Sequence, residues 1–329
     1  MSTLSKHLSR RGRSYGPARG RHACTDLAAG GSAWTGRYRP EAALPTVLYT
    51  ALTRRPRGGS EIKFGVLTTN FGPCGDPRTL VELAQLADDS GWGGFFLWDH
   101  LQWPDMEPAA DPWVALAAIA TATDSMRFGT LVTPLPRRDI VKLAREMITL
   151  DHLSKGRLIL GVGLGWQGIP EYAGFGHEED LRVRGEMLDE GLNVLSRLLS
   201  GKSIHHEGKH YTVVTDQPFA PPNHIPIWVA GQWPSKRPFR RAAHWDGVVP
   251  MSKRALEGGT LTAEDFIELK RLMADECEQR QPFDVVAMGG GAHEGFADAG
   301  VTWHVTPVVP FTQSLDGMRE SISAGPPQA

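Results

Sequence analysis

From residue 62 onward, short apolar runs alternate with longer segments in which apolar residues recur every three or four positions. The short runs are rich in β-branched and aromatic residues, which is typical of buried strands, whereas the longer spacing is typical of amphipathic helices. Strands are predicted at residues 62–69, 94–98, 127–133, 157–162, 225–230, 246–250, 284–288 and 301–306. Helices are predicted at residues 76–89, 111–125, 139–153, 181–199, 236–244, 263–278, 294–299 and 314–323.

These elements make eight strand–helix units over residues 62–325. A (β/α)8 TIM barrel takes about 250 residues, and its strands are buried on both faces, which explains continuous apolar runs instead of alternation. The competing architecture is a doubly wound open sheet, which usually has fewer units. The sequence therefore favours an α/β barrel with two insertions, one after strand four (165–179) and one before strand five (201–224) that contains a hairpin-like segment, SIHHEGKHYTVV.

Residues 1–60 differ from the rest of the chain and define a separate region from the barrel at 61–329. They hold eleven basic and two acidic residues, a net charge of +9, so the remainder carries −11. They show no sustained apolar period, which predicts a basic, disordered extension. Arg10-Arg11 has no apolar run behind it for an export signal, and the segment lacks the interleaved aromatics of a nucleic-acid arm.

Composition excludes several classes of protein. Hydrophobic residues make up 41% and charged residues 22%, and the overall net charge of −2 gives no pull toward nucleic acid or an anionic membrane. The three cysteines lie far apart and fit no disulfide or zinc pattern. No stretch approaches the roughly 18 apolar residues of a membrane helix. We therefore expect a cytoplasmic protein.

Candidate chemistry begins where the second predicted strand ends, at Asp99 and His100. Active sites of TIM barrels lie at the C-terminal ends of the strands, so both residues are expected at the rim of the barrel mouth. There an imidazole can move a proton or bond a cofactor ring. The alternative is a histidine that caps the loop.

Glycines mark two other strand ends. Gly161, Gly163 and Gly165 follow strand four but lack the continuation of a dinucleotide fingerprint. Gly231 and Gln232 follow strand five, just before a helix, where backbone amides and the helix dipole suit a phosphate. An ordinary strand-to-helix loop is the alternative explanation for the second pair.

Other chemistries find little support. His205, His206 and His210 have no carboxylate or thiol pattern to complete a zinc set, so no metal is expected. The chain contains neither a G-x-S-x-G elbow nor a phosphate-binding P-loop. A metal-dependent barrel hydrolase is therefore a weak alternative.

Four sequence features together resemble the bacterial luciferase-like family of flavin-dependent oxidoreductases and monooxygenases. They are WDHL at 98–101, TLDHLSKGRLILGVGLGW at 149–166, Glu171-Tyr172 with Phe175-Gly176, and the pair IPIWVAG at 225–231 and AGVTWHV at 299–305. The resemblance covers about residues 62–327 and all eight units, and the second feature is the most specific. After AGVTW the chain departs from many relatives, because His304-Val305-Thr306-Pro307 stands where they have further aromatic or acidic residues.

The resemblance implies a barrel with FMN or the deazaflavin coenzyme F420 across its C-terminal mouth. It implies that His100 is catalytic with Asp99 as its acidic neighbour, and that a bulge or cis peptide lies near Thr133-Pro134. The remaining implied site residues are Thr133, Gly163, Leu164 and Gly165 against the cofactor, Gly231 and Gln232 at its phosphate, and Trp166, Glu171 and Tyr172 around the substrate mouth.

The implied activity is hydride transfer or oxygenation of a small organic substrate. With FMN, His100 would stabilise or protonate an oxygenated adduct, and with F420 it would act as acid or base during hydride transfer. A separate flavin reductase and a homodimer are the implied partners. The alternative within the same fold is a non-catalytic flavin-binding paralogue.

Overall fold

The computed structural model describes residues 62–327, apart from 218, 222, 255–258, 277–281 and 290–293. The extension predicted over residues 1–60 lies outside these described residues. Within the described part, no helix is both long enough and apolar enough to cross a membrane.

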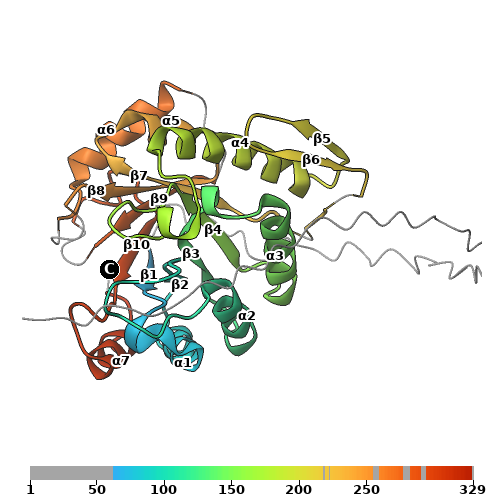
Figure 1. Ribbon diagram of the computed structural model, residues 1–329. Coiled ribbons are helices and arrows are strands. Elements are labelled where there is room, and N and C mark those ends of the chain that lie inside the picture. The colour runs from blue at the N-terminus through green and yellow to red at the C-terminus, as the bar shows by residue number, and fades with distance from the viewer. Residues whose placement is uncertain are drawn as a thin grey trace, which may run out of the picture. The chain divides into compact units, whose positions relative to one another are not determined.

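Eight parallel strands close into a barrel, which confirms the predicted fold class (Figure 1). Around the barrel the strands follow the order β1-β10-β9-β8-β7-β4-β3-β2. Every neighbouring pair is parallel, and the last strand pairs with the first, so the barrel has no free sheet edge. The barrel strands are β1 Lys63–Thr68, β2 Gly94–Leu97, β3 Arg127–Pro134, β4 Leu158–Gly163, β7 Ile227–Trp233, β8 Gly247–Ser252, β9 Asp284–Met288 and β10 Trp303–Pro307.

The helices begin at capped positions that the sequence marks. Asp76, Asp111, Asp139 and Asp180 each accept a hydrogen bond from a backbone amide in the first turn of the following helix. The helices are α1 Pro77–Asp89, α2 Pro112–Ala122, α3 Ile140–Leu153, α4 Leu181–Leu199, α5 Lys236–Ala242, α6 Ala263–Ala274 and α7 Leu315–Ser323, with short 3-10 turns η1 Gly72–Gly75, η2 Leu135–Arg137 and η3 Ala173–Phe175.

Several predicted ends shift by a few residues, and two predictions are wrong in ways that bear on the fold or the site. The helix expected at 294–299 is a series of turns, because Gly295 and Gly300 adopt φ angles of +76° and +82°, outside the helical region. The fifth barrel strand does not stop at Ala230 but continues to Trp233. Gly231 and Gln232 therefore lie within β7, paired with Pro250 and Met251 of β8, and not in a loop before α5.

The predicted hairpin before the fifth barrel strand is present as the antiparallel pair β5 Ile204–Glu207 and β6 Thr212–Thr215 (Figure 1). Glu190 of α4 anchors it. Its carboxylate lies 3.0 Å from His206 Nε2 and accepts the backbone amides of His210 and Tyr211 at 3.0 and 2.9 Å. These histidines attach the hairpin to α4, and among the described residues no three His, Cys, Asp or Glu are grouped to hold a metal.

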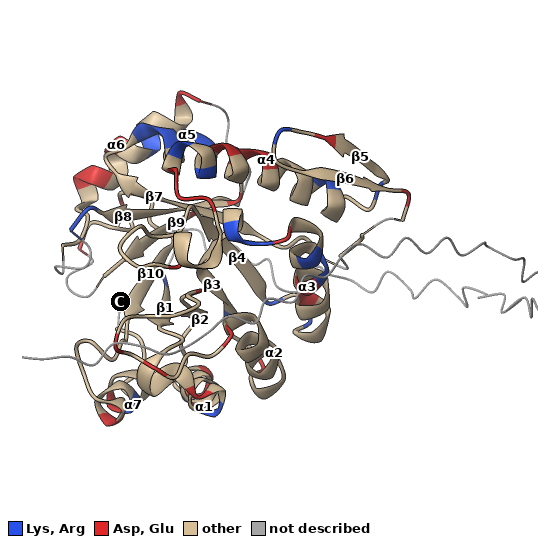
Figure 2. Ribbon diagram, viewed as in Figure 1, with Lys and Arg blue, Asp and Glu red and all other residues tan. Residues whose placement is uncertain are grey.

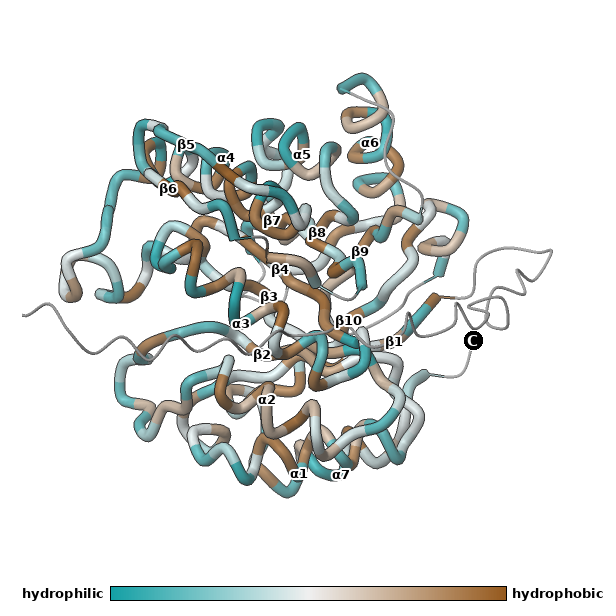
Figure 3. Tube along the Cα trace, turned by 90° about the vertical axis from the view of Figure 1, so that its right-hand side faces the viewer, coloured by the Kyte–Doolittle hydropathy of each residue, from teal (hydrophilic) through white to brown (hydrophobic). Residues whose placement is uncertain are grey.

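Three large aromatic side chains, Phe96, Trp228 and Trp303, fill the inside of the barrel. Their ring centroids lie 5.5 to 6.0 Å apart. Glycines provide the room, since a Cβ on Gly94 would lie 2.8 Å from Phe96 and one on Gly247 2.5 Å from Trp228. The concentration of hydrophobic residues along the strands is visible in Figure 3. The inside of the barrel is therefore filled by packed apolar side chains below the mouth.

Within the most specific family-like motif at 149–166, the turn Ser154-Lys155-Gly156-Arg157 forms a clamp at the start of β4. Gly156 and Lys155 take φ angles of +87° and +58°, which turn the chain sharply after α3. The Arg157 guanidinium then donates to the carbonyls of Ala120, Thr123, Met126 and Ser154 at 2.7 to 3.2 Å. It therefore ties the end of α2 to the turn between α3 and β4.

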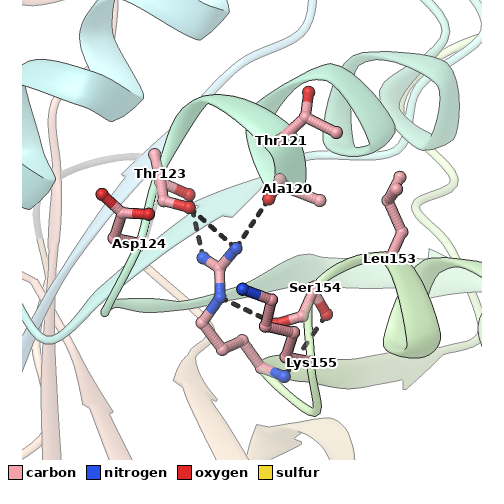
Figure 4. A pocket seen from close by; sticks show the side chains of 8 residues that line it. Ala120, Thr121, Thr123, Asp124, Leu153, Ser154 and Lys155 are labelled. Atoms are coloured by element: carbon pink, nitrogen blue, oxygen red, sulfur yellow. Dashed lines mark hydrogen bonds between the residues drawn. The ribbon is translucent and has the colours of Figure 1, made fainter.

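A surface depression of about 190 Å³ surrounds this clamp (Figure 4). Thr121, Asp124, Leu153 and Lys155 are among the residues that line it. It lies beside the start of β4, at the N-terminal ends of the strands, whereas TIM-barrel sites lie at the opposite end. Because Arg157 is committed to backbone carbonyls there, we interpret the depression as part of the clamp and not as a ligand site.

We predict that Arg157→Lys lowers the free energy of unfolding by about 2 kcal/mol or more, because a lysine cannot reach all of these buried carbonyls. Urea denaturation of both proteins measures the change.

Arg182→Lys is the matched control, since this side chain is 68% exposed and its surface ion pair contributes less than about 1 kcal/mol. Equal urea midpoints for Arg157→Lys and the wild type would contradict the clamp.

Candidate active site

His100 lies just beyond the C-terminal end of β2, as predicted. The side chain of Asn70, which follows β1, holds the backbone of His100. Its Nδ2 donates to the His100 carbonyl at 2.7 Å, and the backbone amide of His100 donates to Asn70 Oδ1 at 3.3 Å. The imidazole is therefore presented from a loop that is fixed to the neighbouring strand.

The His100 ring contacts a buried carboxylate from a distant part of the chain. Its Nδ1 lies 2.9 Å from Oε2 of Glu171, which belongs to the insertion after β4. The other carboxylate oxygen accepts the backbone amides of Leu101 and, at 3.1 Å, Gln102. Glu171 is 1% exposed. It therefore supports the His100 ring and its loop from a buried position, and its predicted part in the substrate mouth stays a prediction.

Arg137, on η2 after β3, joins Glu171 to Asp99. Its Nη1 donates to Glu171 Oε2 at 2.9 Å, and its Nη2 donates to Asp99 Oδ1 at 2.9 Å. Arg138 donates to both oxygens of the Asp99 carboxylate at 2.6 Å. Two arginines and two carboxylates thus form one network that links the loops after β2, β3 and β4.

Asp99 is buried behind His100, with its acceptor positions filled. Besides the two arginines, the Thr133 hydroxyl donates to it at 2.8 Å and Trp113 Nε1 at 3.2 Å. The Thr133 hydroxyl is engaged in that bond, so its predicted contact with a cofactor stays a prediction. The expected bulge and cis peptide are both present on β3, slightly earlier than Thr133: the Leu131–Val132 peptide is cis, and the pairing with β4 shifts there.

Both carboxylates are charged in this network. Burial alone would raise the pKa of Asp99, but the charges of Arg138 and Arg137 and the bonds from Arg138 and Thr133 outweigh it and lower that pKa. Burial likewise opposes ionisation of Glu171, yet its bond to His100, the charges of His100 and Arg137 and the Gln102 amide lower its pKa. The buried charges are paired, as low-dielectric surroundings require.

The glycines after β4 have a steric explanation. Gly165 has a φ of +77°, and a Cβ on it would lie 1.5 Å from the Tyr172 hydroxyl. That hydroxyl donates to the Leu164 carbonyl at 2.9 Å. On Gly163 a Cβ would lie 2.9 Å from Val132, so β4 approaches β3 closely at the mouth. The backbone of residues 163–165 is thereby held in one place.

Tyr172 is buried, and its predicted part in shaping the substrate mouth stays a prediction. The Arg184 guanidinium of α4 stacks over its ring at 3.9 Å and donates to the Leu164 carbonyl at 3.1 Å. Trp166, by contrast, is partly exposed. Of the three predicted mouth residues, Trp166 alone presents its side chain to solvent.

Five aromatic side chains gather beside His100, and we name Phe71, Trp98, Trp103, Trp166 and Phe311 the aromatic cluster. Trp103 is central, with ring centroids 4.9 Å from Phe71, 5.4 Å from Trp166 and 5.4 Å from Phe311. The His100 ring lies 5.2 Å from Trp103 and 5.6 Å from Trp98 in edge-on arrangements. The imidazole is thus one edge of an aromatic wall.

The predicted phosphate residues lie on the other side of the barrel. A Cβ on Gly231 would lie 2.3 Å from Pro238, so this glycine lets α5 pack against β7. The neighbouring Gln232 is exposed. Their contact with a phosphate stays a prediction.

Several site residues were missed by the sequence analysis: Asn70, Trp103, Arg137, Arg138 and Phe311. The adjacent arginines after the third strand were a usable signal, because two cations at a barrel rim need anionic partners. Trp103 and Phe311 gave no such signal, since isolated aromatics in loops carry no pattern.

The observed fold and rim define a closed parallel barrel whose ionisable network lies at the C-terminal ends of its strands. The family model described as luciferase-like monooxygenase matches residues 51–289, more than half of the chain. The chain belongs to this family.

Curated relatives match parts of the chain. The F420-dependent hydroxymycolic acid dehydrogenase of Mycobacterium tuberculosis (strain ATCC 25618 / H37Rv) is 34% identical over 162 residues, 47% of this chain and 44% of that protein. The F420-dependent glucose-6-phosphate dehydrogenase of Amycolatopsis mediterranei (strain U-32) is 29% identical over 220 residues, 59% of this chain and 65% of that protein. The chain thus spans less than two thirds of the length of these relatives.

Solved structures share the fold. An F420-dependent secondary alcohol dehydrogenase in complex with an F420-acetone adduct superposes with a TM-score of 0.62 at 15% identity, covering 79% of this chain and 96% of that one. The monooxygenase RslO1 from Streptomyces bottropensis gives 0.56 at 23% identity, covering 73% and 75%.

We predict that acid removes the stability that Asp99 contributes. Because its folded pKa lies below the unfolded value of 3.8, that stability is present above the unfolded pKa and is lost as pH falls through the folded pKa. The difference in unfolding free energy between the wild type and Asp99→Asn should therefore narrow below about pH 4. Urea midpoints measured across this range test it.

The exposed Asp105 supplies the control variant, Asp105→Asn. If the difference in unfolding free energy between the wild type and Asp99→Asn stays constant on acidification, the buried ion pairs contribute no pH-dependent stability.

Proposed function

We propose that the chain is an oxidoreductase that uses coenzyme F420 to oxidise a small organic alcohol to a carbonyl compound. The observation that carries the proposal is the His100–Glu171 pair, which orients an imidazole at the barrel mouth. The two curated relatives compared above are described as F420-dependent dehydrogenases, which supports F420 over FMN. An FMN-dependent monooxygenase is the second candidate, supported by monooxygenases such as RslO1 among the structural neighbours.

The residues at the barrel mouth fit a flat cofactor ring. Near the C-terminal ends of their strands, three side chains pack onto the apolar barrel interior: Val132, Met251 and Met288. Gly163, at the end of β4, adds no side chain there. These residues would hold the ring. Gln232 at the end of β7 is exposed, and Lys253 and Arg254, also exposed, follow β8, which suits an anionic cofactor tail.

When bound, the deazaflavin ring supplies a hydride acceptor. In the proposed reaction, His100 is the residue of the protein that accepts the proton. The Glu171 carboxylate engages Nδ1, so Nε2 is the ring nitrogen left to exchange a proton with a substrate, and it has no hydrogen bond to any described residue. In our proposal Nε2 of His100 would take up the O–H proton of the alcohol as the C=O bond forms, and the hydride of the carbinol C–H bond would go to the acceptor that the cofactor supplies.

Glu171, Arg137 and Asp99 act through His100 as positioning residues. Arg137 bonds both carboxylates, so it keeps Glu171 ionised and its oxygen aimed at Nδ1. In the proposal the ionised Glu171 carboxylate orients the imidazole and would offset the positive charge that His100 gains on taking up the alcohol proton, which is what a base in alcohol oxidation needs. A non-catalytic paralogue would bind the same cofactor without turning over any alcohol.

We predict that His100→Ala lowers kcat by roughly 10²- to 10⁴-fold while the Kd for F420 changes little, because the variant loses proton transfer and keeps the ring-binding surface. Anaerobic assays of alcohol-dependent F420 reduction, together with F420 and FMN titrations followed by absorbance, measure both quantities.

His205→Ala is the control, since this histidine is 71% exposed on the hairpin. Glu171→Gln should fall between the wild type and His100→Ala. Undiminished turnover in His100→Ala would remove His100 from the mechanism, and tight F420 binding without turnover of any alcohol by the wild type would identify a non-catalytic paralogue.

We also propose that the protein forms a homodimer. The surface of α2 supports this proposal. The helix carries no charged residue, and Val114, Ala118 and Thr121 are exposed along one of its faces, with Val114 at 70%. An amphipathic surface helix would be polar there. A separate flavin reductase applies to the FMN alternative, and a cytoplasmic location stays a prediction.

We predict that Val114→Glu converts a wild-type dimer into a monomer, because a charge buried in the interface would be unpaired. Light scattering during size-exclusion chromatography measures the mass.

Val214→Glu, at a 59% exposed position on the hairpin, is the matched control and should leave the dimer intact. A monomeric wild-type protein would refute the proposed interface.

A further inference from the structure

The aromatic cluster is assembled from separate parts of the chain. Phe71 follows β1, Trp98 and Trp103 follow β2, Trp166 follows β4 and Phe311 follows β10. Trp98 and Phe311 approach each other to 6.1 Å, and Phe71 and Phe311 to 5.8 Å, so the cluster closes around Trp103. Segments far apart in sequence have thus been brought together to form an apolar wall next to His100.

Part of this wall faces solvent. Phe311 is 47% exposed and Leu101, next to His100, is 43% exposed. Trp98, Trp103 and Trp166 are each partly exposed. Apolar surface that converges on an oriented imidazole is typical of a binding site for an organic molecule and costs free energy when left in water.

The segments that supply the wall carry no positive charge. Residues 69–76, 98–111, 164–176 and 308–313 contain no lysine or arginine. They do contain exposed carboxylates, at Asp105, Glu107 and Asp111. Figure 2 shows Lys and Arg residues close together on α5, as well as on other helices such as α3.

The cations nearest to His100 along the network are already neutralised. Arg137 bonds Asp99 and Glu171, and Arg138 bonds both oxygens of Asp99. A phosphate or carboxylate on a substrate would find no guanidinium among these groups that lacks a carboxylate partner, and it would lose hydration without full compensation.

We infer that the substrate is an uncharged alcohol whose carbinol carbon carries an apolar ring, bound with that ring against the aromatic cluster and its hydroxyl toward His100 Nε2. The inference rests on the proposed function and names its substrate class. It excludes sugar phosphates, because the segments around His100 offer them carboxylates in place of cations. Aromatic rings recognise such a body by offset and edge-on contacts as well as by removing it from water.

The test measures binding without turnover. Protein loaded with reduced F420 cannot accept a hydride, so calorimetric titration gives a Kd for each alcohol. We expect 1-phenylethanol to bind at least about tenfold more tightly than glucose 6-phosphate. Phe311→Lys should raise the Kd for 1-phenylethanol by about tenfold, because it removes one ring of the aromatic cluster. It should also narrow the difference between the Kd values of the two compounds, because it adds a cation.

Phe175→Lys is the matched control, since Phe175 is 50% exposed on η3 and makes no ring contact within the described residues. It should leave both Kd values unchanged. Equal or tighter binding of glucose 6-phosphate, or an unaltered 1-phenylethanol Kd in Phe311→Lys, would overturn the inference.

Failure of the proposed function gives a different result. A protein that binds neither F420 nor FMN in absorbance titrations would refute the proposed function itself. Binding of F420 with no preference for the ring-bearing alcohol would overturn the substrate class alone.

Discussion

The buried carboxylate of Glu171 is the interaction on which the arrangement of the barrel mouth depends. It receives His100 Nδ1, the Arg137 guanidinium and two backbone amides of the loop after β2. Without it, Arg137 would keep a buried charge with only Asp99 to pair it, and breaking a buried ion pair costs about 3–5 kcal/mol. The same group therefore secures three loops and sets which nitrogen of His100 is available, so stability and chemistry at this end of the barrel are coupled.

The two ends of the barrel are organised by different kinds of contact. At the start of β4, Arg157 donates to backbone carbonyls with no carboxylate among those partners. At the mouth, Arg137 and Arg138 pair with the carboxylates of Asp99 and Glu171. The aromatic interior formed by Phe96, Trp228 and Trp303 lies between the two ends. The motif at 149–166 that most clearly marks the family thus serves both ends: its turn at 154–157 stabilises the fold, and its last residues, 163–166, lie at the mouth.

Most of the fold could be predicted because barrel strands are continuous apolar runs and helix starts carry Asp caps. The turns at 294–299 could not, since Gly295 and Gly300 take φ angles that no local pattern specifies. The place of His100 followed from its position after a strand. The burial of Glu171 and Tyr172 did not, because it depends on how the insertion after β4 folds back over Arg137 and Arg184. Contacts between segments some 70 residues apart leave no trace in a local sequence pattern.

The way this insertion is fastened has a practical consequence for redesign. Its first residues are held where the Tyr172 hydroxyl and Arg184 meet the Leu164 carbonyl, and Glu171 secures it again seven residues later. Between these two anchors, Trp166 is partly exposed, and Gln167 and Gly168 are exposed. A library randomised at these three positions would vary the surface next to the aromatic cluster, where a substrate would bind. It would leave the residues that support the imidazole unchanged. The scaffold thereby separates what can be diversified from what must be kept.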